Sequence, residues 1–412
     1  SCDADGRYVV VPPEPGEGNG IGEVWPTLTE AWRSPWRVIV VAADLAPIVA
    51  TTLITDLATP SEIDDTAWIH PGRASWSWWS DHDSPQSLPA LHRYIDFAAD
   101  MGWEHSLVDA NWDTHPEEAI RELVTHGRSR GVGVWLWYNS GGAHNEVTER
   151  PRDRMDDPVV RRAEFAKLAA WGVAGVKVDF FQSDKPHGIQ LIWDILSDAA
   201  EHKIMVNLHG CTVPRGWQRT WPHLMTVEGV RGGEQYAFAE TYPETAPWHN
   251  TILPYTRNVI GPMDYTPVTI SDQLYPHLTS AAHELALGLL YESGVQHYAD
   301  SIEAYRALPA EAIGVLERVP AVWDEVRHLS GYPGHHCVIA RRHGSAWYLA
   351  GIAAQEPVDL DLDLAWLGEA REGLLITDRH NGALAITRTT IDPSERWHLR
   401  IPGRGGFVLE LR

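Results

Sequence analysis

The chain has 412 residues and a formal net charge of -23, and this length can hold one large domain and a small one. The acidic excess argues against nucleic-acid binding, because phosphate groups need a basic face. The sequence shows no signal peptide and no run of the roughly 18 apolar residues that a membrane span needs. These features leave the compartment open.

Tryptophan is unusually frequent, with 20 tryptophans against 6 phenylalanines. Flat rings with one polar edge suit sugar binding, because they stack on the apolar faces of pyranose rings and tolerate a wet rim. The alternative is that many of them fill core positions. The three cysteines, Cys2, Cys211 and Cys337, are too few and too scattered for a disulfide framework or a zinc site.

The first 34 residues are rich in Gly, Pro and Glu, and we expect a linker or the remnant of an upstream domain there. Residues 35–41 predict a strand and residues 44–57 a short helix. From Arg73 onward, predicted strands alternate with helices. The strands are expected at residues 74–79, 106–108, 132–138, 172–181, 204–208 and 224–227, with weaker candidates at 263–268 and 295–300. Helices are expected near residues 88–100, 157–171, 192–199 and 271–292.

Strands that alternate with helices predict an α/β fold, and two architectures compete. Six clear units and two weaker ones fit a (β/α)₈ TIM barrel over residues 35–328. A doubly wound sheet fits less well, because no dinucleotide-binding loop is present. After the barrel, short strands separated by turn residues predict a small antiparallel all-β domain over residues 329–412, with Asn381-Gly382 typical of a hairpin turn.

The predicted strand at residues 172–181 carries the main candidate for chemistry. Its run is apolar and β-branched, as in a strand buried on both faces, and it ends at Asp179. An acid at the carboxyl end of a barrel strand points into the mouth where active sites form. The alternative is structural: Asp179 caps the next helix, or pairs with Lys177 on the same face of the strand.

Polar side chains also follow the other predicted strands. Carboxylates beside tryptophan, without a phosphate or nicotinamide motif, favour acid–base or nucleophilic attack on a sugar. Each candidate for holding sugar hydroxyl groups also has a structural alternative. These candidates are Asp109, Trp112, Asn139, Lys177, Asn207, His209 and Arg231.

Glu228 and Glu234 lie six residues apart on a glycine-rich loop. Two such acids can converge on one hard cation, since carboxylate oxygens suit calcium and glycine lets the backbone turn. The alternative is a solvated loop in which Arg231 neutralises both acids.

Several stretches resemble glycoside hydrolase family 97, and together they span about residues 34–300. They are residues 34–37, 65–74, 76–79, 175–180 and 257–268, and the run Glu228-Gly229-Val230-Arg231-Gly232-Gly233-Glu234. The resemblance implies a leading β-sandwich, a (β/α)₈ barrel and a trailing β domain. It also implies action on α-glycosides with bound Ca²⁺.

The family resemblance also bears on mechanism. The inverting α-glucosidases of family 97 carry glutamate bases after the third and fifth strands. At these places this chain has Asn-Ser-Gly-Gly (139–142) and Asn-Leu-His-Gly (207–210). The retaining, α-galactosidase-like members of the family use an aspartate after the fourth strand, which is the place of Asp179. The resemblance therefore implies a retaining exo-acting α-galactosidase with Asp179 as nucleophile and Glu234 as general acid/base. Glu228 and Glu234 match its calcium ligands.

Only about 70 residues precede the barrel, so we expect the leading β-sandwich to be absent or to lie on a separate chain. In relatives this domain supplies a further calcium ligand and part of the site wall. By the same resemblance, the location would be periplasmic or secreted. Two alternative functions stay open: an inverting α-glucosidase in which Asp179 only binds substrate, and a sugar-binding barrel without catalysis.

Overall fold

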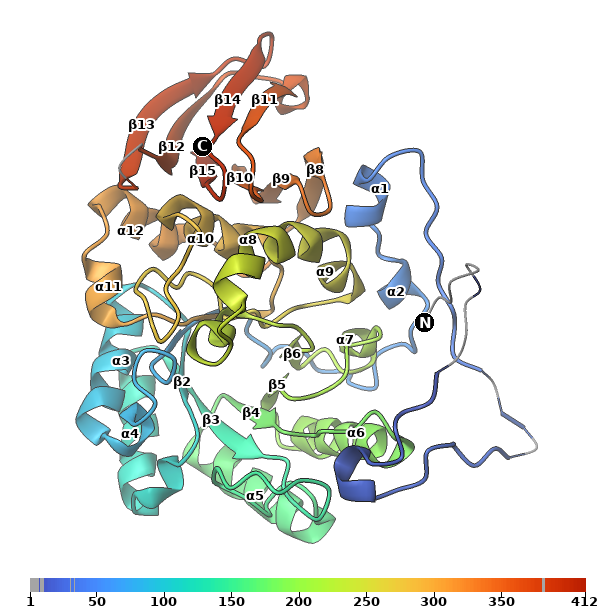
Figure 1. Cartoon of the computed structure of the whole chain (residues 1–412). Helices are drawn as coiled ribbons and strands as arrows, with labels where there is room; N and C mark the ends of the chain where they lie inside the picture. The colour runs from blue at the N-terminus through green and yellow to red at the C-terminus, as the bar shows by residue number, and fades with distance from the viewer. Residues whose placement is uncertain (1–6, 8–10, 30, 33, 380–381) are drawn as a thin grey trace.

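In the computed structural model, a parallel β-barrel carries a smaller β-sheet domain (Figure 1). The structure describes residues 7, 11–29, 31–32, 34–379 and 382–412. Cys2 lies outside these residues, and so does Asn381, the first residue of the predicted hairpin turn. Seven parallel strands pair in the order β6-β5-β4-β3-β2-β1-β7. They are β1 (Gly72–Trp76), β2 (His105–Val108), β3 (Gly133–Asn139), β4 (Gly175–Asp179), β5 (Met205–Leu208), β6 (Leu224–Val227) and β7 (Val295–Tyr298).

The barrel prediction is confirmed, with an irregular strand at one position. A single parallel bridge joins Val227 to Met263, so the segment after Met263 fills the place between β6 and β7. The predicted strand at 263–268 is wrong as a regular strand. Thr266 and Val268 have positive φ angles of 56° and 65°, which extended backbone does not use.

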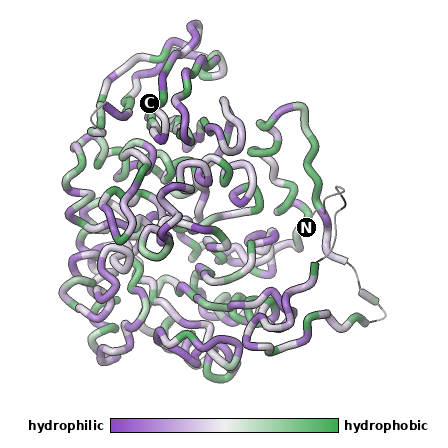
Figure 2. Tube along the Cα trace, viewed as in Figure 1, coloured by the Kyte–Doolittle hydropathy of each residue, from purple (hydrophilic) through white to green (hydrophobic). Residues whose placement is uncertain are grey.

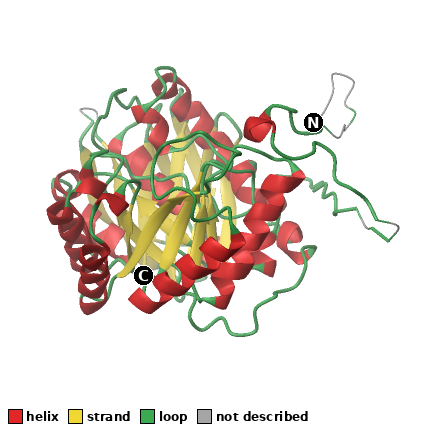
Figure 3. Cartoon of the chain, turned by 90° about the horizontal axis from the view of Figure 1, so that it is seen from below, coloured by secondary structure: helices red, strands yellow, loops and turns green. Residues whose placement is uncertain are grey.

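Helices surround the strands, as Figure 3 shows in red around yellow. None of the helices formed by the described residues is long and apolar enough to cross a membrane. The α-helices are α1 (Ala46–Val49), α2 (Leu53–Asp56), α3 (Leu88–Asp100), α4 (Glu117–Ser129), α5 (Pro158–Trp171), α6 (Pro186–Glu201), α7 (Trp217–Thr220), α8 (Tyr242–Ile252), α9 (Arg257–Ile260), α10 (Ala281–Leu290), α11 (Ile302–Arg306) and α12 (Ala310–Arg318). The short 3-10 helices are η1 (Glu17–Gly20), η2 (Ser84–Gln86), η3 (Trp112–Thr114), η4 (Gly233–Ala237), η5 (Leu253–Tyr255) and η6 (Ala365–Leu367).

Two predicted helices have different bounds in the structure. The helix at 44–57 divides into α1 and α2. The long helix at 271–292 begins only with α10, because Ser280 is its N-cap and accepts a hydrogen bond from the backbone of His283 at 3.1 Å. The preceding residues form a loop, in which the carboxylate of Asp300 accepts from the backbone of Ser271 at 2.7 Å.

The predicted strand at 35–41 is wrong. These residues form no regular element, and the side chains of Ile39 and Val41 are 68% and 88% exposed. The run is visible as a green stretch at the right of Figure 2. A β-branched run forms a strand only where a neighbouring strand accepts its hydrogen bonds, and residues 35–41 pair with no strand of the described chain.

Part of the segment before residue 34 packs on the barrel. The backbone of Gly18, in η1, donates to Gln182 O at 3.0 Å. Lys185, at the start of α6, donates from Nζ to Pro15 O at 2.7 Å. Residues 15–18 are therefore attached to the loop between β4 and α6, while the boundary at residue 34 stays a prediction.

The C-terminal β domain is confirmed as two antiparallel sheets, with strand orders β13-β12-β15-β10-β9-β8 and β11-β14. Asp378 links it to the barrel, because its carboxylate accepts from Ser280 and from the first turn of α10. Strand β8 crosses the expected boundary at 329, which stays a prediction. The strands are β8 (Glu325–Tyr332), β9 (His336–His343), β10 (Ala346–Ala353), β11 (Val358–Asp363), β12 (Arg371–Asp378), β13 (Leu384–Ile391), β14 (Arg396–Ile401) and β15 (Gly406–Leu411).

Candidate active site

The carboxyl ends of the parallel strands meet at one mouth of the barrel, where β4 ends in Asp179. Pairing of β3 with β4 sets Asn139 beside Asp179, and pairing of β4 with β5 sets Lys177 beside Asn207. Side chains two residues apart on a strand share a face. Lys177 and Asp179 therefore approach the same interior from successive levels of β4.

The carboxylate of Asp179 is held by two donors. The indole Nε1 of Trp137 donates to Oδ2 at 3.2 Å, and the backbone of Phe180 donates to Oδ1 at 2.7 Å. The pKa of Asp179 is raised, because burial outweighs the charges of His209 and Lys177, which lower it. Both hydrogen-bond donors lack acceptor capacity and so favour the ionised carboxylate. Asp179 does not cap the next helix, because α6 begins several residues later.

Lys177 lies at the centre of a buried group of charges. Its Nζ donates to Asp109 Oδ2 at 3.1 Å and lies 4.7 Å from the ring centroid of Trp76. The Nε1 of Trp76 donates to the same aspartate oxygen at 2.8 Å. Burial opposes the charge of the lysine, but Asp109, Glu234 and Asp179 outweigh it and raise the pKa of Lys177. Lys177 therefore forms its ion pair with Asp109, and not with Asp179 as the structural alternative had proposed.

The segment after β6 places two glutamates, Glu228 and Glu234, at the same mouth of the barrel. Glu228 accepts a hydrogen bond at Oε2 from the backbone of Gly210 at 2.8 Å. Glu234 lies in η4, directly after Gly232 and Gly233. A Cβ added at Gly232 would lie 2.5 Å from Tyr265 O, so this turn requires glycine for the close approach of two backbones.

Glu234 is polarised by two cations. Its Oε1 lies 3.7 Å from His209 Nδ1 and 3.9 Å from Lys177 Nζ, and this buried oxygen has no hydrogen-bond partner. Burial raises the pKa of Glu234 to about 7; Lys177 and His209 oppose the shift, while Glu228 and Asp179 add to it. A buried carboxyl group that is protonated near neutral pH suits a general acid.

A buried aspartate orients the histidine of this group. Asp264 accepts at Oδ2 from Asn207 Nδ2 at 2.6 Å and lies 2.7 Å from His209 Nε2; its Oδ1 lies 3.1 Å from His297 Nδ1. Burial would raise the pKa of Asp264, but the two histidines hold it well below its usual range. Burial and Lys177 lower the pKa of His209, whereas Glu228 and Asp264 raise it, to about 9. His209 therefore carries a positive charge at neutral pH.

Glu228, Glu234 and His209 each place one possible ligand atom within 4.8 Å of the others. Calcium takes oxygen ligands, so the two glutamates fit this ion and the protonated imidazole does not. The unpartnered Oε1 of Glu234 is the oxygen best placed to accept a cation. Arg231 lies with its guanidinium 5.5 Å from the ring centroid of Tyr242 instead.

Aromatic rings extend outward from the site. Trp76 stacks on Trp78 at 5.7 Å between centroids, and Trp78 stacks on His82 at 4.2 Å. His82 in turn stacks on Phe238 at 5.9 Å, and the Phe238 side chain is 53% exposed. Trp76 is buried, but the rings from Trp78 to Phe238 are partly exposed and fit the apolar faces of sugar rings.

Two family models match the chain. The glycoside hydrolase 97 model matches residues 68–230, and the model described as glycosyl-hydrolase 97 C-terminal, oligomerisation, matches residues 322–412. The chain belongs to glycoside hydrolase family 97. A probable retaining α-galactosidase of Streptomyces bingchenggensis is 41% identical over 337 residues, which are 79% of this chain and 50% of the relative. A retaining α-galactosidase of Bacteroides thetaiotaomicron is 31% identical over 410 residues, 92% of this chain and 60% of the relative.

Solved structures share the fold of this chain. A crystal structure of β-arabinopyranosidase has 35% sequence identity and a TM-score of 0.92, and the match covers 98% of this chain and 65% of that one. A family 97 enzyme from Pseudoalteromonas in complex with panose, at 22% identity and a TM-score of 0.78, shares the fold. This chain thus spans about half to two thirds of the length of its relatives.

In this family 97 chain, four predicted substrate-binding residues surround the acids. Asp109, Lys177, Asn207 and His209 all contact one another or an acid of the mouth, whereas Asn139 does not face it. The Nδ2 of Asn139 donates to two backbone carbonyls of the loop after β3, and its Oδ1 accepts from two donors of that loop. Its amide is fully engaged there, so its contact with substrate stays a prediction.

The contacts described for Trp112 and Arg231 are to groups other than the acids. Trp112 is buried, and its Nε1 donates to the backbone carbonyl of Trp137 at 2.7 Å. Arg231 is exposed and lies over the ring of Tyr242. Their contacts are those of a core residue and a surface residue, and their roles in substrate binding stay predictions.

Sequence reasoning missed four residues of the site. Trp76 and Trp137 face the interior from β1 and β3, and His297 does so from β7. Asp264 stood within the family-like run 257–268, which was a usable signal, but nothing in the sequence linked it to His209. That contact depends on the irregular path of the chain after Met263.

Proposed function

We propose that this chain is the catalytic part of a retaining, exo-acting α-glycosidase and that its substrate is an α-galactoside. The observation that carries the proposal is the meeting of two acids at one mouth of the barrel. Asp179 ends β4 two residues after Lys177, and Glu234 Oε1 lies 3.9 Å from Lys177 Nζ and 3.7 Å from His209 Nδ1. One acid has donors that favour its ionised form, and the other has a pKa raised to about 7. Retaining hydrolysis requires such a division between nucleophile and acid.

The proposed reaction has two displacements. A carboxylate oxygen of Asp179 attacks the anomeric carbon while Glu234 donates its proton to the departing glycosidic oxygen, which yields a covalent glycosyl-enzyme. Glu234, now ionised, removes a proton from a water molecule that attacks the same carbon. The bond to Asp179 breaks, and the sugar leaves with its original anomeric configuration.

Neighbouring side chains support these roles. Lys177 and His209 carry positive charge beside both acids and stabilise negative charge as it passes from one to the other. Asp109 fixes the ammonium of Lys177, and Asp264 fixes the imidazole of His209. The partly exposed row of rings from Trp78 to Phe238 would receive the sugar or its aglycone.

The sugar is assigned from the relatives together with ring chemistry. The two curated relatives are named retaining α-galactosidases, and the similar solved structure is a β-arabinopyranosidase. β-L-Arabinopyranose has the ring configuration of α-D-galactopyranose and lacks only its C6 hydroxymethyl group. A site built for one ring therefore admits the other, and relative activity on the two glycosides measures the contacts made to C6.

Proton NMR of the first-formed sugar tests the proposal. We expect an aryl α-galactoside to release α-galactose first, followed by slow mutarotation to the β anomer. An initial β anomer would instead establish inversion. No hydrolysis of either glycoside would favour a sugar-binding barrel. The carboxyl ends of β3 and β5 favour retention, because they carry Asn139 and Asn207 and no glutamate.

We also propose that Glu228 and Glu234 hold a Ca²⁺ ion. Their oxygens lie close together, and Glu234 Oε1 has no hydrogen-bond partner. When bound, such an ion would oppose the raised pKa of Glu234, so its role would be to orient the substrate and this acid. Further ligands would be water or a part of the protein outside this chain, because calcium takes about six to eight oxygens.

Calcium is expected to raise the thermal unfolding temperature of the chelator-treated chain. At a concentration 100 times the dissociation constant, binding to the folded state alone stabilises by about 2.7 kcal/mol. Glu228→Gln should abolish this shift, whereas Glu240→Gln, an exposed glutamate beyond the same loop, should keep it. An equal shift in both variants would show that calcium binds elsewhere.

We further propose that another domain, on the same or a separate chain, covers the segment before β1. Five apolar side chains of this segment, together with the coverage of the relatives, support this. They are Trp25, Trp32, Trp36, Ile39 and Val41, each more than half exposed. Large apolar side chains that are exposed along one segment are typical of a surface that a partner covers.

A further inference from the structure

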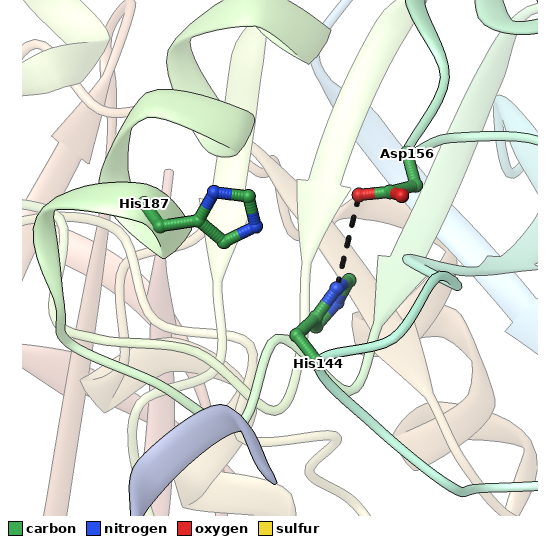
Figure 4. A group of neighbouring side chains, drawn as sticks. All are labelled: His144, Asp156 and His187. Atoms are coloured by element: carbon green, nitrogen blue, oxygen red, sulfur yellow. Dashed lines mark ion pairs between the residues drawn. The ribbon is translucent and has the colours of Figure 1, made fainter. Parts of the chain in front are cut away.

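A second group of possible metal ligands lies apart from the acids of the barrel mouth. His144 and Asp156 come from the segment between β3 and α5, and His187 from the first turn of α6 (Figure 4). One ligand atom of each lies within 4.8 Å of the other two. The His144 Nδ1 lies 3.8 Å from Asp156 Oδ1, and the two imidazole rings are 6.2 Å apart between centroids.

Hydrogen bonds around Ser140 favour a lone pair on Nδ1 of His144, although Asn145 Nδ2 also lies 3.5 Å from His144 Nε2. Ser140 Oγ donates to Phe180 O at 3.1 Å and lies 2.8 Å from His144 Nε2. With its proton directed at Phe180, the hydroxyl accepts from Nε2–H, so the lone pair of the ring is on Nδ1. His144 is only 3% exposed, and its Nδ1 has no hydrogen-bond partner. An unpaired buried nitrogen therefore faces Asp156 and His187.

The two outer ligands have room to adjust. Asp156 is half-buried and His187 is exposed. A Cβ at Gly142 would lie 2.4 Å from Asp156 Oδ2, so the absent side chain allows the carboxylate to approach. Ligands on one tetrahedral zinc ion lie about 3.3 Å apart, given bond lengths of about 2.0–2.2 Å. The present spacing of at most 4.8 Å must shorten toward that value when an ion binds.

The N-terminal segment encloses this group from one side. The Cβ that Gly18 lacks would lie 3.6 Å from His144 Cβ, and that of Gly22 would lie 2.7 Å from His187 Cβ. Asn19 Nδ2 also donates to Ala143 O at 3.1 Å. The segment passes below the cluster in Figure 4 as a pale blue ribbon. Three parts of the chain that are distant in sequence thus meet at the cluster.

We propose that His144, Asp156 and His187 bind one divalent transition-metal ion, with Zn²⁺ as the preferred ion. Two imidazole nitrogens and one carboxylate suit zinc and its neighbours, whereas calcium requires oxygen ligands. The site leaves the fourth position of a tetrahedral zinc to water. The ion joins the segment after β3 to the start of α6 beneath the N-terminal segment.

Isothermal titration of the chelator-treated full chain with Zn²⁺ tests this proposal, with Co²⁺ as a spectroscopic probe. We expect one tight site, and visible absorption bands of tetrahedral Co²⁺. His187→Ala and Asp156→Asn should each raise the Zn²⁺ dissociation constant at least tenfold, because each removes a ligand. Both residues are solvent-accessible, so folding is retained. Excess Ca²⁺ should not compete.

Two controls separate this site from others. His398→Ala removes an exposed histidine that has a single aspartate 3.5 Å away, and it should leave Zn²⁺ binding unchanged. Glu228→Gln removes an acid of the barrel mouth and should also leave it unchanged. Unaltered binding in both His187→Ala and Asp156→Asn would overturn the proposal, as would loss of binding in Glu228→Gln alone. Neither result depends on glycosidase activity.

Discussion

Asp179→Asn is expected to lower kcat/KM for an aryl α-galactoside by about 10⁴-fold or more, without loss of the fold. The amide cannot form the covalent glycosyl-enzyme, and removal of a nucleophile leaves only the catalysis from binding and charge stabilisation. The substitution is nearly isosteric, and its one oxygen can accept from either Trp137 or Phe180, which bond different oxygens of Asp179. Initial rates at subsaturating substrate measure the loss.

A control variant and a rescue experiment test whether the loss of activity reflects the removal of a nucleophile. Asp83→Asn alters an exposed acid that follows β1 and should keep activity within about twofold of the unaltered chain. Asp179→Gly should regain turnover with azide and release β-galactosyl azide, because azide enters from the face that the carboxylate occupied. Substantial activity of Asp179→Asn, or an α-azide product, would show that another group is the nucleophile.

Asp264→Ala is expected to lower the free energy of unfolding by about 3–5 kcal/mol, because it leaves buried, positively polarised partners without their acceptor. Asn207, His209 and His297 all direct a side-chain nitrogen at this carboxylate. The measurement is the urea unfolding midpoint at neutral pH, with the slope checked for constancy.

The control for Asp264 is Asp359→Ala. Asp359 forms an exposed ion pair with Arg400 in the C-terminal domain, and exposed pairs contribute little to stability. Both variants remove a carboxylate, from a buried site at Asp264 and from the surface at Asp359. A midpoint for Asp264→Ala as high as that of Asp359→Ala would mean that the histidines do not depend on this carboxylate.

The sequence was sufficient to predict the barrel and the end of β4. A buried β-branched run with an acid at its end has few structural interpretations, and Asp179 lies where that pattern placed it. The glutamates after β6 were found because glycines flank them, and Gly232 does allow the close approach to Tyr265. Sequence patterns predicted the position of a residue correctly where that position depends on residues close to it in the chain.

Contacts between distant segments could not be predicted in this way. The partner of Lys177 is Asp109, which follows a different strand, because the register between strands and not spacing within one strand decides the pair. Asp264 lies on a backbone that positive φ angles at Thr266 and Val268 keep from forming a regular strand. The apolar run at 35–41 failed as a strand because it has no partner strand in the described chain.

Mass spectrometry of the chain after reaction with a fluorinated α-galactosyl fluoride tests the central claim most directly. Fluorine slows breakdown of the glycosyl-enzyme, so the account predicts one added sugar per chain, located by peptide mapping on Asp179 and absent from Asp179→Asn. A label on Glu228 or Glu234, or turnover of the reagent with no covalent adduct at all, would contradict it.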